Sequence, residues 1–178
     1  EEPVSEWGKI KDRKGETILS KFYANQQKYA FSFQMMAYIS RISALKKAVK
    51  DHPEKIIMCE RSVFTDRNVF AQMLYDSGNI EDVELEIYQK WFNEFIEEIP
   101  VSGVIYVKAS PEVSYNRVIK RNRDGETIPL DYLRKCHEYH EKWLEKTEDK
   151  LVLNADDHKE MSEDHYKDWL NQIEKFIS

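Results

Sequence analysis

Short apolar runs alternate along the chain with long segments in which apolar residues recur every three or four positions. The short runs occupy residues 55–60, 103–108 and 150–154, and more than 40 residues separate each from the next. Strands that are joined by such long, helical connections pair in parallel. The pattern therefore predicts the α/β class, with a mainly parallel sheet covered by helices.

The segments between these runs have helical spacing. They predict helices over residues 29–50, 63–75, 81–99, 111–121, 129–147 and 160–177. The helix over residues 81–99 carries a continuous apolar stripe, which must pack against another element. Because the chain has no internal repeat, low-complexity tract or linker, we expect residues 1–178 to form a single domain.

Composition narrows the range of functions. The 178 residues carry 27 Lys and Arg against 33 Asp and Glu, and the net charge of −6 argues against nucleic acid as a partner. No apolar run approaches the ~20 residues of a membrane-spanning helix, so we expect no membrane association. Two cysteines suit a reducing compartment, which indicates the cytoplasm. A mitochondrial address on a segment upstream of Glu1 stays an alternative.

Two adjacent charges, Glu60 and Arg61, follow the first apolar run where a helix begins. Ligands of open α/β sheets bind at the carboxyl ends of the strands, so both side chains are expected to face a ligand. On the following helix, Asp66 and Phe70 are four residues apart and share a face. The alternative is a structural ion pair beside a core phenylalanine.

A second cluster consists of Arg117, Arg121 and Arg123, of which the first two share a helix face. Guanidinium groups grip phosphate oxygens with two hydrogen bonds each, so the three together suit a triphosphate. The alternative is a solvated helix face, because Lys120 and nearby acidic residues dilute the cluster.

A third group lies on the helix over residues 29–50, where Gln34, Ala37 and Arg41 fall on one face. The carboxamide of glutamine carries both a donor and an acceptor and can match the edge of a nucleobase in either orientation. Alone, this spacing is a weak indication of base binding.

Several segments taken together resemble the deoxyribonucleoside kinase family that includes deoxycytidine and deoxyguanosine kinases. In order they are EPV with W at 2–7, FSFQ at 31–34, ERS at 60–62, three arginines at 117–123 and HxxHExWL at 137–144. The resemblance covers nearly the whole chain. It implies a three-layer P-loop kinase fold with a five-stranded parallel sheet, ATP and a deoxynucleoside as substrates, a role in nucleoside salvage, and a homodimer in which aromatic helical stripes are candidate surface.

The resemblance also implies catalytic roles. Glu2 would be the base that accepts the proton of the sugar 5′-hydroxyl. Glu60 would help to hold Mg²⁺, and Arg61 would lie beside the 5′-oxygen and the transferring phosphoryl group. The lid that closes over the ATP phosphates would be formed by Arg117, Arg121 and Arg123.

Five further residues would bind the nucleoside if the resemblance holds. Tyr23 and Glu126 would hold the sugar 3′-hydroxyl. Gln34 would read the base, Phe70 would stack on it, and Trp7 would form a wall of the pocket.

Base preference should depend on Arg41 and Asp66, because thymidine-preferring members of the family are apolar at these positions to accept a methyl group. A charged pair disfavours that methyl and offers hydrogen bonds to an amino or carbonyl edge. We therefore predict deoxycytidine, deoxyadenosine or deoxyguanosine as substrate in preference to thymidine.

Two departures from the family pattern stand out. The lid is one residue shorter near Glu126, which leaves the equivalence of that residue open. The chain also has no G-x-x-x-x-G-K-[ST] segment, whose glycines and backbone amides cradle phosphates after the first strand. The resemblance therefore leads us to expect that this strand and its P-loop lie upstream of Glu1.

Two other functions compete with this interpretation. A nucleoside monophosphate kinase of the thymidylate type shares the fold but needs basic residues for an acceptor phosphate, whereas Tyr23, Gln34 and the charged pair suit an uncharged nucleoside. The second alternative is a non-catalytic protein that has lost its P-loop and only binds a nucleoside or a partner. Retention of Glu2, Glu60, Arg61 and all three lid arginines argues against this second alternative.

Overall fold

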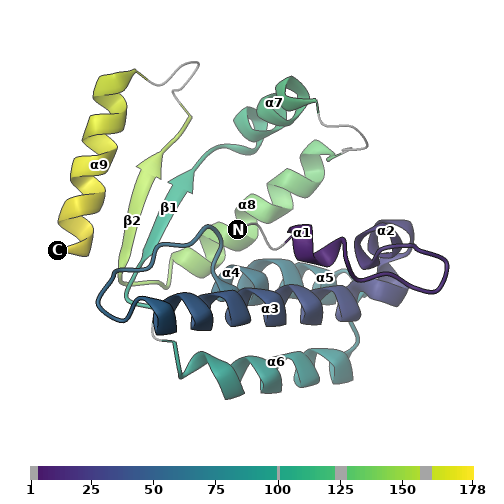
Figure 1. The fold of residues 1–178 in the computed structure, drawn as a ribbon. Helices are drawn as coiled ribbons and strands as arrows, with labels where there is room; N and C mark the ends of the chain where they lie inside the picture. Colours follow the sequence, from purple (N-terminus) through teal and green to yellow (C-terminus); the bar gives the residue numbers. More distant parts are fainter. Residues whose placement is uncertain (1–3, 100, 123–127, 157–161) are drawn as a thin grey trace. The chain divides into compact units, whose positions relative to one another are not determined.

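The chain folds into two units, residues 1–100 and 101–178 (Figure 1). The structure is a computed structural model that describes residues 4–99, 101–122, 128–156 and 162–178. Within these residues, the first unit is built from helices and the second contains the sheet.

The first unit contains short and long helices in the order α1 (Val4–Trp7), α2 (Ile18–Ala24), α3 (Gln26–Asp51), α4 (Val63–Thr65), the π-helix η1 (Asp66–Ala71), α5 (Gln72–Asp76) and α6 (Asp82–Ile96). Polar side chains fix where these helices begin. The side chains of Thr17, Asn25 and Ser62 accept hydrogen bonds from backbone amides in the first turns of α2, α3 and α4, respectively. Glu81 and Glu84 form a capping box at the start of α6.

The core of this unit lies where α3, α6 and the segment from α4 to η1 pack together. Its buried residues are Tyr38, Ile42, Val63, Ala71, Tyr88, Phe92 and Ile99. Phe95 and Ile96 pack against this cluster from the same stripe of α6. The prediction that residues 81–99 pack an apolar face is confirmed.

The second unit contains β1 (Val104–Lys108), α7 (Pro111–Arg121), α8 (Leu130–Leu144), β2 (Lys150–Asn154) and α9 (Glu163–Ile177). β1 and β2 pair in parallel, with Val104 opposite Lys150 and Lys108 opposite Asn154. The connection between them runs through α7 and α8, and α9 lies along β2 (Figure 1). Parallel strands joined through helices confirm the predicted α/β class.

The predicted strand over residues 55–60 is wrong. This segment has no regular secondary structure, and its apolar side chains Ile56 and Met58 are 69% and 62% exposed. A strand forms only against a hydrogen-bonding neighbour, and within the described residues the sheet consists of β1 and β2 alone. The apolar run at residues 55–60 therefore indicates a tendency to form a strand, but it does not show whether a second strand is available to pair with it.

The predicted helices are confirmed with small shifts at their ends. After α5 the chain turns at Gly78, whose φ is 72°. The segment over residues 63–75 departs most from expectation, because its middle is a π-helix rather than an α-helix. In the described part of the chain, no helix combines the length and apolar character needed to span a membrane.

Candidate functional site

A buried ion pair between Arg41 of α3 and Asp66 of η1 lies at the centre of the candidate site. The Arg41 Nε and Asp66 Oδ2 atoms are 2.8 Å apart, and the two side chains are only 11% and 4% exposed. Moving two charges out of water is costly, and only close approach offsets that cost. Each charge therefore depends on the other.

Burial raises the pKa of Asp66 to about 6, while the positive charges of Arg41 and Arg61 act in the opposite direction. The folded-state pKa thus lies above the ordinary value of 3.8. Ionisation of Asp66 consequently lowers the stability of the fold as the pH rises from about 4 to about 6. A carboxyl group poised in this way is typical of a functional site.

The π-helix η1 begins at Asp66 and contains Phe70, which lies four residues further along. π-helices are rare and frequently occur at functional sites, because the wider turn redirects the side chains that follow. Ser62 fixes the approach to this turn, since its hydroxyl accepts the Thr65 amide at 3.2 Å.

Arg61 lies directly before this segment and has a φ of 56°, in the left-handed region. A residue other than glycine in this region is strained, and such strain concentrates at functional sites. The Arg61 guanidinium carbon lies 5.4 Å from the centre of the Phe70 ring. The structure thus brings together three of the predicted site residues, Arg61, Asp66 and Phe70. The side chain of Glu60, which precedes them, is exposed.

Gln34 lies on α3, two helical turns before Arg41, and is only 4% exposed. Its side-chain oxygen Oε1 is buried and has no hydrogen-bond partner among the described residues. An unmet buried acceptor costs about 1–3 kcal/mol, so such atoms usually have a water or ligand partner. The predicted base-reading residue therefore carries an acceptor that a ligand can satisfy.

Trp7 of α1 forms an aromatic wall beside the charged pair. It is 6% exposed, and the Arg41 guanidinium carbon lies 5.6 Å from the centre of its ring. Its indole Nε1 donates a hydrogen bond to Ser40 Oγ at 2.8 Å, and Phe33 packs edge-on against it at 5.4 Å. Ser40 was not predicted from the sequence, because a serine within a helix gives no signal of its own.

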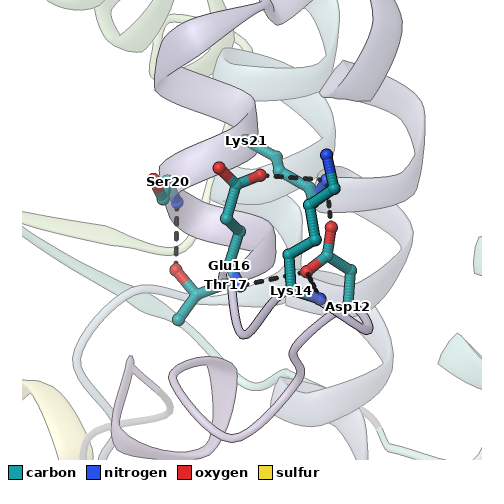
Figure 2. A network of polar contacts seen from close by, with 6 residues as sticks. All are labelled: Asp12, Lys14, Glu16, Thr17, Ser20 and Lys21. Carbon is teal, nitrogen blue, oxygen red and sulfur yellow. Dashed lines mark hydrogen bonds and ion pairs between the residues drawn. The ribbon is translucent and has the colours of Figure 1, made fainter.

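A polar network holds the turn before α2 (Figure 2). Asp12 Oδ1 accepts the backbone amides of Lys14 at 2.8 Å and Glu16 at 3.0 Å. Lys21 Nζ then lies 2.7 Å from Asp12 Oδ2 and 3.3 Å from Glu16 Oε2. The Lys21 ammonium lowers the pKa of Asp12. This network, which sequence reasoning missed, ties the turn to the helix that follows it.

The next residues of α2 connect this turn to the aromatic wall. The ring of Phe22 stacks on Phe33 with a centre-to-centre distance of 4.4 Å. Tyr23, the predicted ligand of the sugar 3′-hydroxyl, is 72% exposed. Its side chain is accessible to a ligand and is not part of the buried cluster.

Two of the three arginines predicted to form a lid, Arg117 and Arg121, lie on α7 in the second unit. Arg117 Nη2 of α7 donates to the Ala155 carbonyl oxygen at 2.5 Å, which uses one of its five donors. Arg121 lies in the last turn of α7, which ends at Asn122 in a left-handed conformation with a φ of 47°. The predicted residues Glu2, Arg123 and Glu126 lie outside the described residues.

The fit to Mg²⁺ rests on Glu60. Among the described residues, no three His, Cys, Asp or Glu side chains gather where they could hold a metal ion. Mg²⁺ commonly keeps several waters and binds one or two carboxylates together with substrate phosphates. An exposed carboxylate such as Glu60 fits that mode of binding.

The first unit contains the buried amide of Gln34, the buried pair of Arg41 and Asp66, and the aromatic ring of Trp7. This combination is typical of a site for a small, polar, planar molecule. Comparison with known proteins gives the class directly, because the sequence model of the deoxynucleoside kinase family matches residues 1–178. The chain belongs to the deoxynucleoside kinase family, which has a P-loop kinase fold, and the predicted resemblance is confirmed.

Curated relatives agree with this assignment. A probable deoxycytidine kinase of Fowlpox virus is 38% identical over 81% of this chain and 60% of its own length. The Homo sapiens deoxycytidine kinase is 30% identical over 99% of this chain and 79% of its own length. The mitochondrial deoxyguanosine kinase of Xenopus laevis is 32% identical over 82% of this chain. The chain spans 60% of the viral relative and 62% of the Xenopus laevis relative.

We expect the variant Arg41→Met to lower the free energy of unfolding by ~3–5 kcal/mol at pH 8, because it leaves the Asp66 carboxylate buried without its partner. The loss should shrink at pH 5, where Asp66 is protonated and needs no counter-charge. Urea unfolding at both pH values measures this difference.

The control is Arg134→Met, which breaks a pair with Glu112 in which the two side chains are 50% and 58% exposed. Exposed pairs of this kind contribute ~0–1 kcal/mol, so this variant should be nearly neutral at both pH values. An equal loss for Arg41→Met at pH 5 and pH 8 would contradict the dependence on Asp66.

Proposed function

We propose that the protein is a deoxyribonucleoside kinase that transfers the γ-phosphate of ATP to the 5′-hydroxyl of a deoxynucleoside. The observation that carries this proposal is the buried set of Gln34, Arg41 and Asp66 beside Trp7, since together they offer hydrogen bonds to a base edge and a flat wall for its ring. Relatives named deoxycytidine and deoxyguanosine kinases support the same substrate class.

Catalysis in this proposal consists mostly of positioning and electrostatics. Glu2 accepts the proton of the 5′-hydroxyl as that oxygen attacks phosphorus. Arg61 lies beside the reacting oxygens, and its guanidinium carbon lies 5.4 Å from the centre of the Phe70 ring. Mg²⁺, held in part by Glu60, would neutralise phosphate charge when bound.

The proposed lid supplies the remaining positive charge. Arg117, Arg121 and Arg123 would contact the phosphate oxygens and stabilise the charge that spreads over them during transfer. The hydrogen bond from Arg117 to the Ala155 carbonyl oxygen ties α7, which carries Arg117 and Arg121, to the segment after β2.

Base preference follows from the chemistry of the charged pair. The Asp66 carboxylate accepts hydrogen bonds from an exocyclic amino group, and Arg41 donates to a ring nitrogen or carbonyl. A thymine methyl group at the same place would remove water from both charges without replacing its hydrogen bonds. We therefore propose deoxycytidine, deoxyadenosine or deoxyguanosine as the preferred substrate, ahead of thymidine.

The direct test incubates the full-length gene product with Mg²⁺, ATP labelled on its γ-phosphate and each of the four deoxynucleosides. Transfer of label to deoxycytidine, deoxyadenosine or deoxyguanosine, with slower transfer to thymidine, supports the proposal. Transfer to deoxynucleoside monophosphates alone would identify a monophosphate kinase instead. Nucleoside binding without any transfer would identify a binding protein.

For specificity, we expect Arg41→Met combined with Asp66→Ala to move the ratio of kcat/KM values toward thymidine by ~10-fold or more, because an apolar surface accepts the methyl group. Steady-state assays with thymidine and deoxycytidine measure the ratio. The matched control, Arg134→Met combined with Glu112→Ala, removes an exposed ion pair and should leave the ratio unchanged. An unaltered ranking in the first variant would place base choice elsewhere.

For the base, we expect Glu2→Gln to lower kcat by ~10²–10⁴-fold with little change in nucleoside affinity, because the amide keeps the size of the side chain but accepts no proton. Single-turnover kinetics and equilibrium binding separate the two effects. Glu1→Gln is the neighbouring control and should retain its kcat. Equal losses of turnover and affinity in Glu2→Gln would assign this residue to substrate binding.

We further propose a homodimer that forms through α6 and a location in the cytoplasm. Val83, Ile87 and Trp91 lie on one face of α6 at intervals of four residues and are 60%, 42% and 45% exposed. A continuous apolar face of this kind is typical of a protein interface.

The proposed location in the cytoplasm rests on the cysteines. Cys59 and Cys136 are not joined in a disulfide, which suits a reducing compartment.

We expect Trp91→Glu to convert the dimer to a monomer, because a carboxylate buried in an apolar interface has no counter-charge. Sedimentation equilibrium measures the mass in solution. Lys90→Glu, on the neighbouring exposed position of the same helix, introduces the same charge and should leave the dimer intact. A monomeric wild-type protein at micromolar concentration would contradict the dimer.

A further inference from the structure

Trp7 lies in a segment that has little secondary structure of its own to hold it. The helix α1 spans only the four residues Val4–Trp7, and so short a helix is not stable by itself. The Trp7 side chain is nevertheless only 6% exposed. The contacts that its indole ring makes with the rest of the first unit therefore determine where this residue lies.

Three side chains of α3 contact the indole. Phe33 packs edge-on against the ring, with the two ring centres 5.4 Å apart, and the Arg41 guanidinium carbon lies over the ring, 5.6 Å from its centre. Ser40 Oγ accepts a hydrogen bond from the indole Nε1 at 2.8 Å. Contacts with aromatic rings are favourable over a range of distances and orientations, whereas a hydrogen bond weakens steeply when its donor turns away. The bond to Ser40 is thus the contact that fixes the orientation of the indole.

The Ser40 hydroxyl is itself held in the orientation that this bond needs. An indole N–H can only donate, so the hydroxyl oxygen must accept. The same hydroxyl donates to the carbonyl oxygen of Ala37, which lies 3.0 Å from Ser40 Oγ. Its proton is therefore directed at the backbone of α3, which leaves a lone pair of the oxygen for Trp7.

Ser40 and Arg41 are consecutive residues of α3 that contact different parts of the same indole. Ser40 binds the N–H group, and the guanidinium of Arg41 lies over the ring. Arg41 also forms the buried ion pair with Asp66. The position of Trp7 on α3 therefore determines its position relative to the charged pair.

We propose that Ser40 is a positioning residue: its hydroxyl fixes the orientation of the Trp7 indole, and the indole in that orientation forms the flat wall against which the base of the nucleoside packs. The consequence for nucleoside binding rests on the proposed function, in which Trp7 borders the base. Ser40 touches no substrate and acts only through Trp7.

The variant Ser40→Ala removes the acceptor and keeps the helix, because alanine is the strongest helix former. Ser40→Thr is the conservative variant, since a threonine hydroxyl in a helix can bond the carbonyl oxygens of the preceding turn as serine does. Ser43→Ala changes an exposed serine of the same helix and is the matched control.

The orientation of Trp7 is measured by NMR on ¹⁵N-labelled protein. Its indole signal, one of four, is assigned from the variant Trp7→Phe. We expect Ser40→Ala to speed the exchange of the Trp7 indole proton with water by ~10-fold, because the N–H loses its acceptor. The NOEs between the Trp7 and Phe33 rings should weaken in the same variant. Ser40→Thr should restore both signals, and Ser43→Ala should leave both unchanged.

For binding, we expect Ser40→Ala to raise the KM for deoxycytidine by roughly 5-fold and to leave kcat and the KM for ATP unchanged, because the wall contacts the base and not the reacting groups. Steady-state assays of the full-length gene product measure these constants, and calorimetry gives the Kd for deoxycytidine. Ser40→Thr should restore the wild-type KM, and Ser43→Ala should retain it.

Three results would overturn the inference. The first is a Trp7 indole whose exchange and NOEs are the same in Ser40→Ala as in the wild type. The second is a failure of Ser40→Thr to restore them, which would show that the hydroxyl is not the group that matters. The third is a fall in kcat together with a rise in the KM for ATP in Ser40→Ala, which would show a general loosening of the fold.

The two kinds of measurement separate this inference from the proposed function. If the wild type neither binds nor phosphorylates any of the four deoxynucleosides, the proposed function is wrong, and the NMR measurements, which need no ligand, decide whether Ser40 orients Trp7. If the wild type binds deoxycytidine and Ser40→Ala binds it equally tightly, the proposed function stands and the inference is overturned.

Discussion

The structure of the first unit depends on burying Arg41 and Asp66 together. Two charges with 11% and 4% exposed side chains are tolerated only at contact distance, so α3 and η1 must keep a fixed register. The buried ring of Trp7 lies against the Arg41 guanidinium. The same packing that stabilises this unit therefore places the groups proposed to read the base, and disturbing one disturbs the other.

Most of the fold could be predicted from the sequence because burial is periodic along helices and strands. The stripe over residues 81–99 and the strands near 103–108 and 150–154 depend on local pattern alone. The same reasoning fails for residues 55–60, because a strand forms only beside another strand with which it can hydrogen-bond. The π-helix was not predicted either, because one wide turn within a short helix barely changes the spacing of apolar residues along the sequence.

The candidate site was predictable where chemistry and spacing coincide. Asp66 with Phe70 and Gln34 with Arg41 share helix faces, but the contact between Arg41 and Asp66 joins segments that local spacing cannot relate. The family resemblance supplied that link. Tyr88 lies within the apolar stripe predicted over residues 81–99, but the surroundings of its hydroxyl depend on how α6 packs against the rest of the unit.

The unfavourable features of the first unit are concentrated in one place. Arg61 holds a left-handed backbone, Gln34 Oε1 and the Tyr88 hydroxyl are buried without partners among the described residues, and Asp66 carries a pKa of about 6. Each feature costs stability in the unliganded protein. Such costs are retained where a ligand or a water compensates for them, and a bound nucleoside in the proposed reaction supplies the donors that Gln34 and Asp66 lack. Preorganisation of this kind makes base recognition selective, because a base that does not satisfy these groups leaves their cost in place.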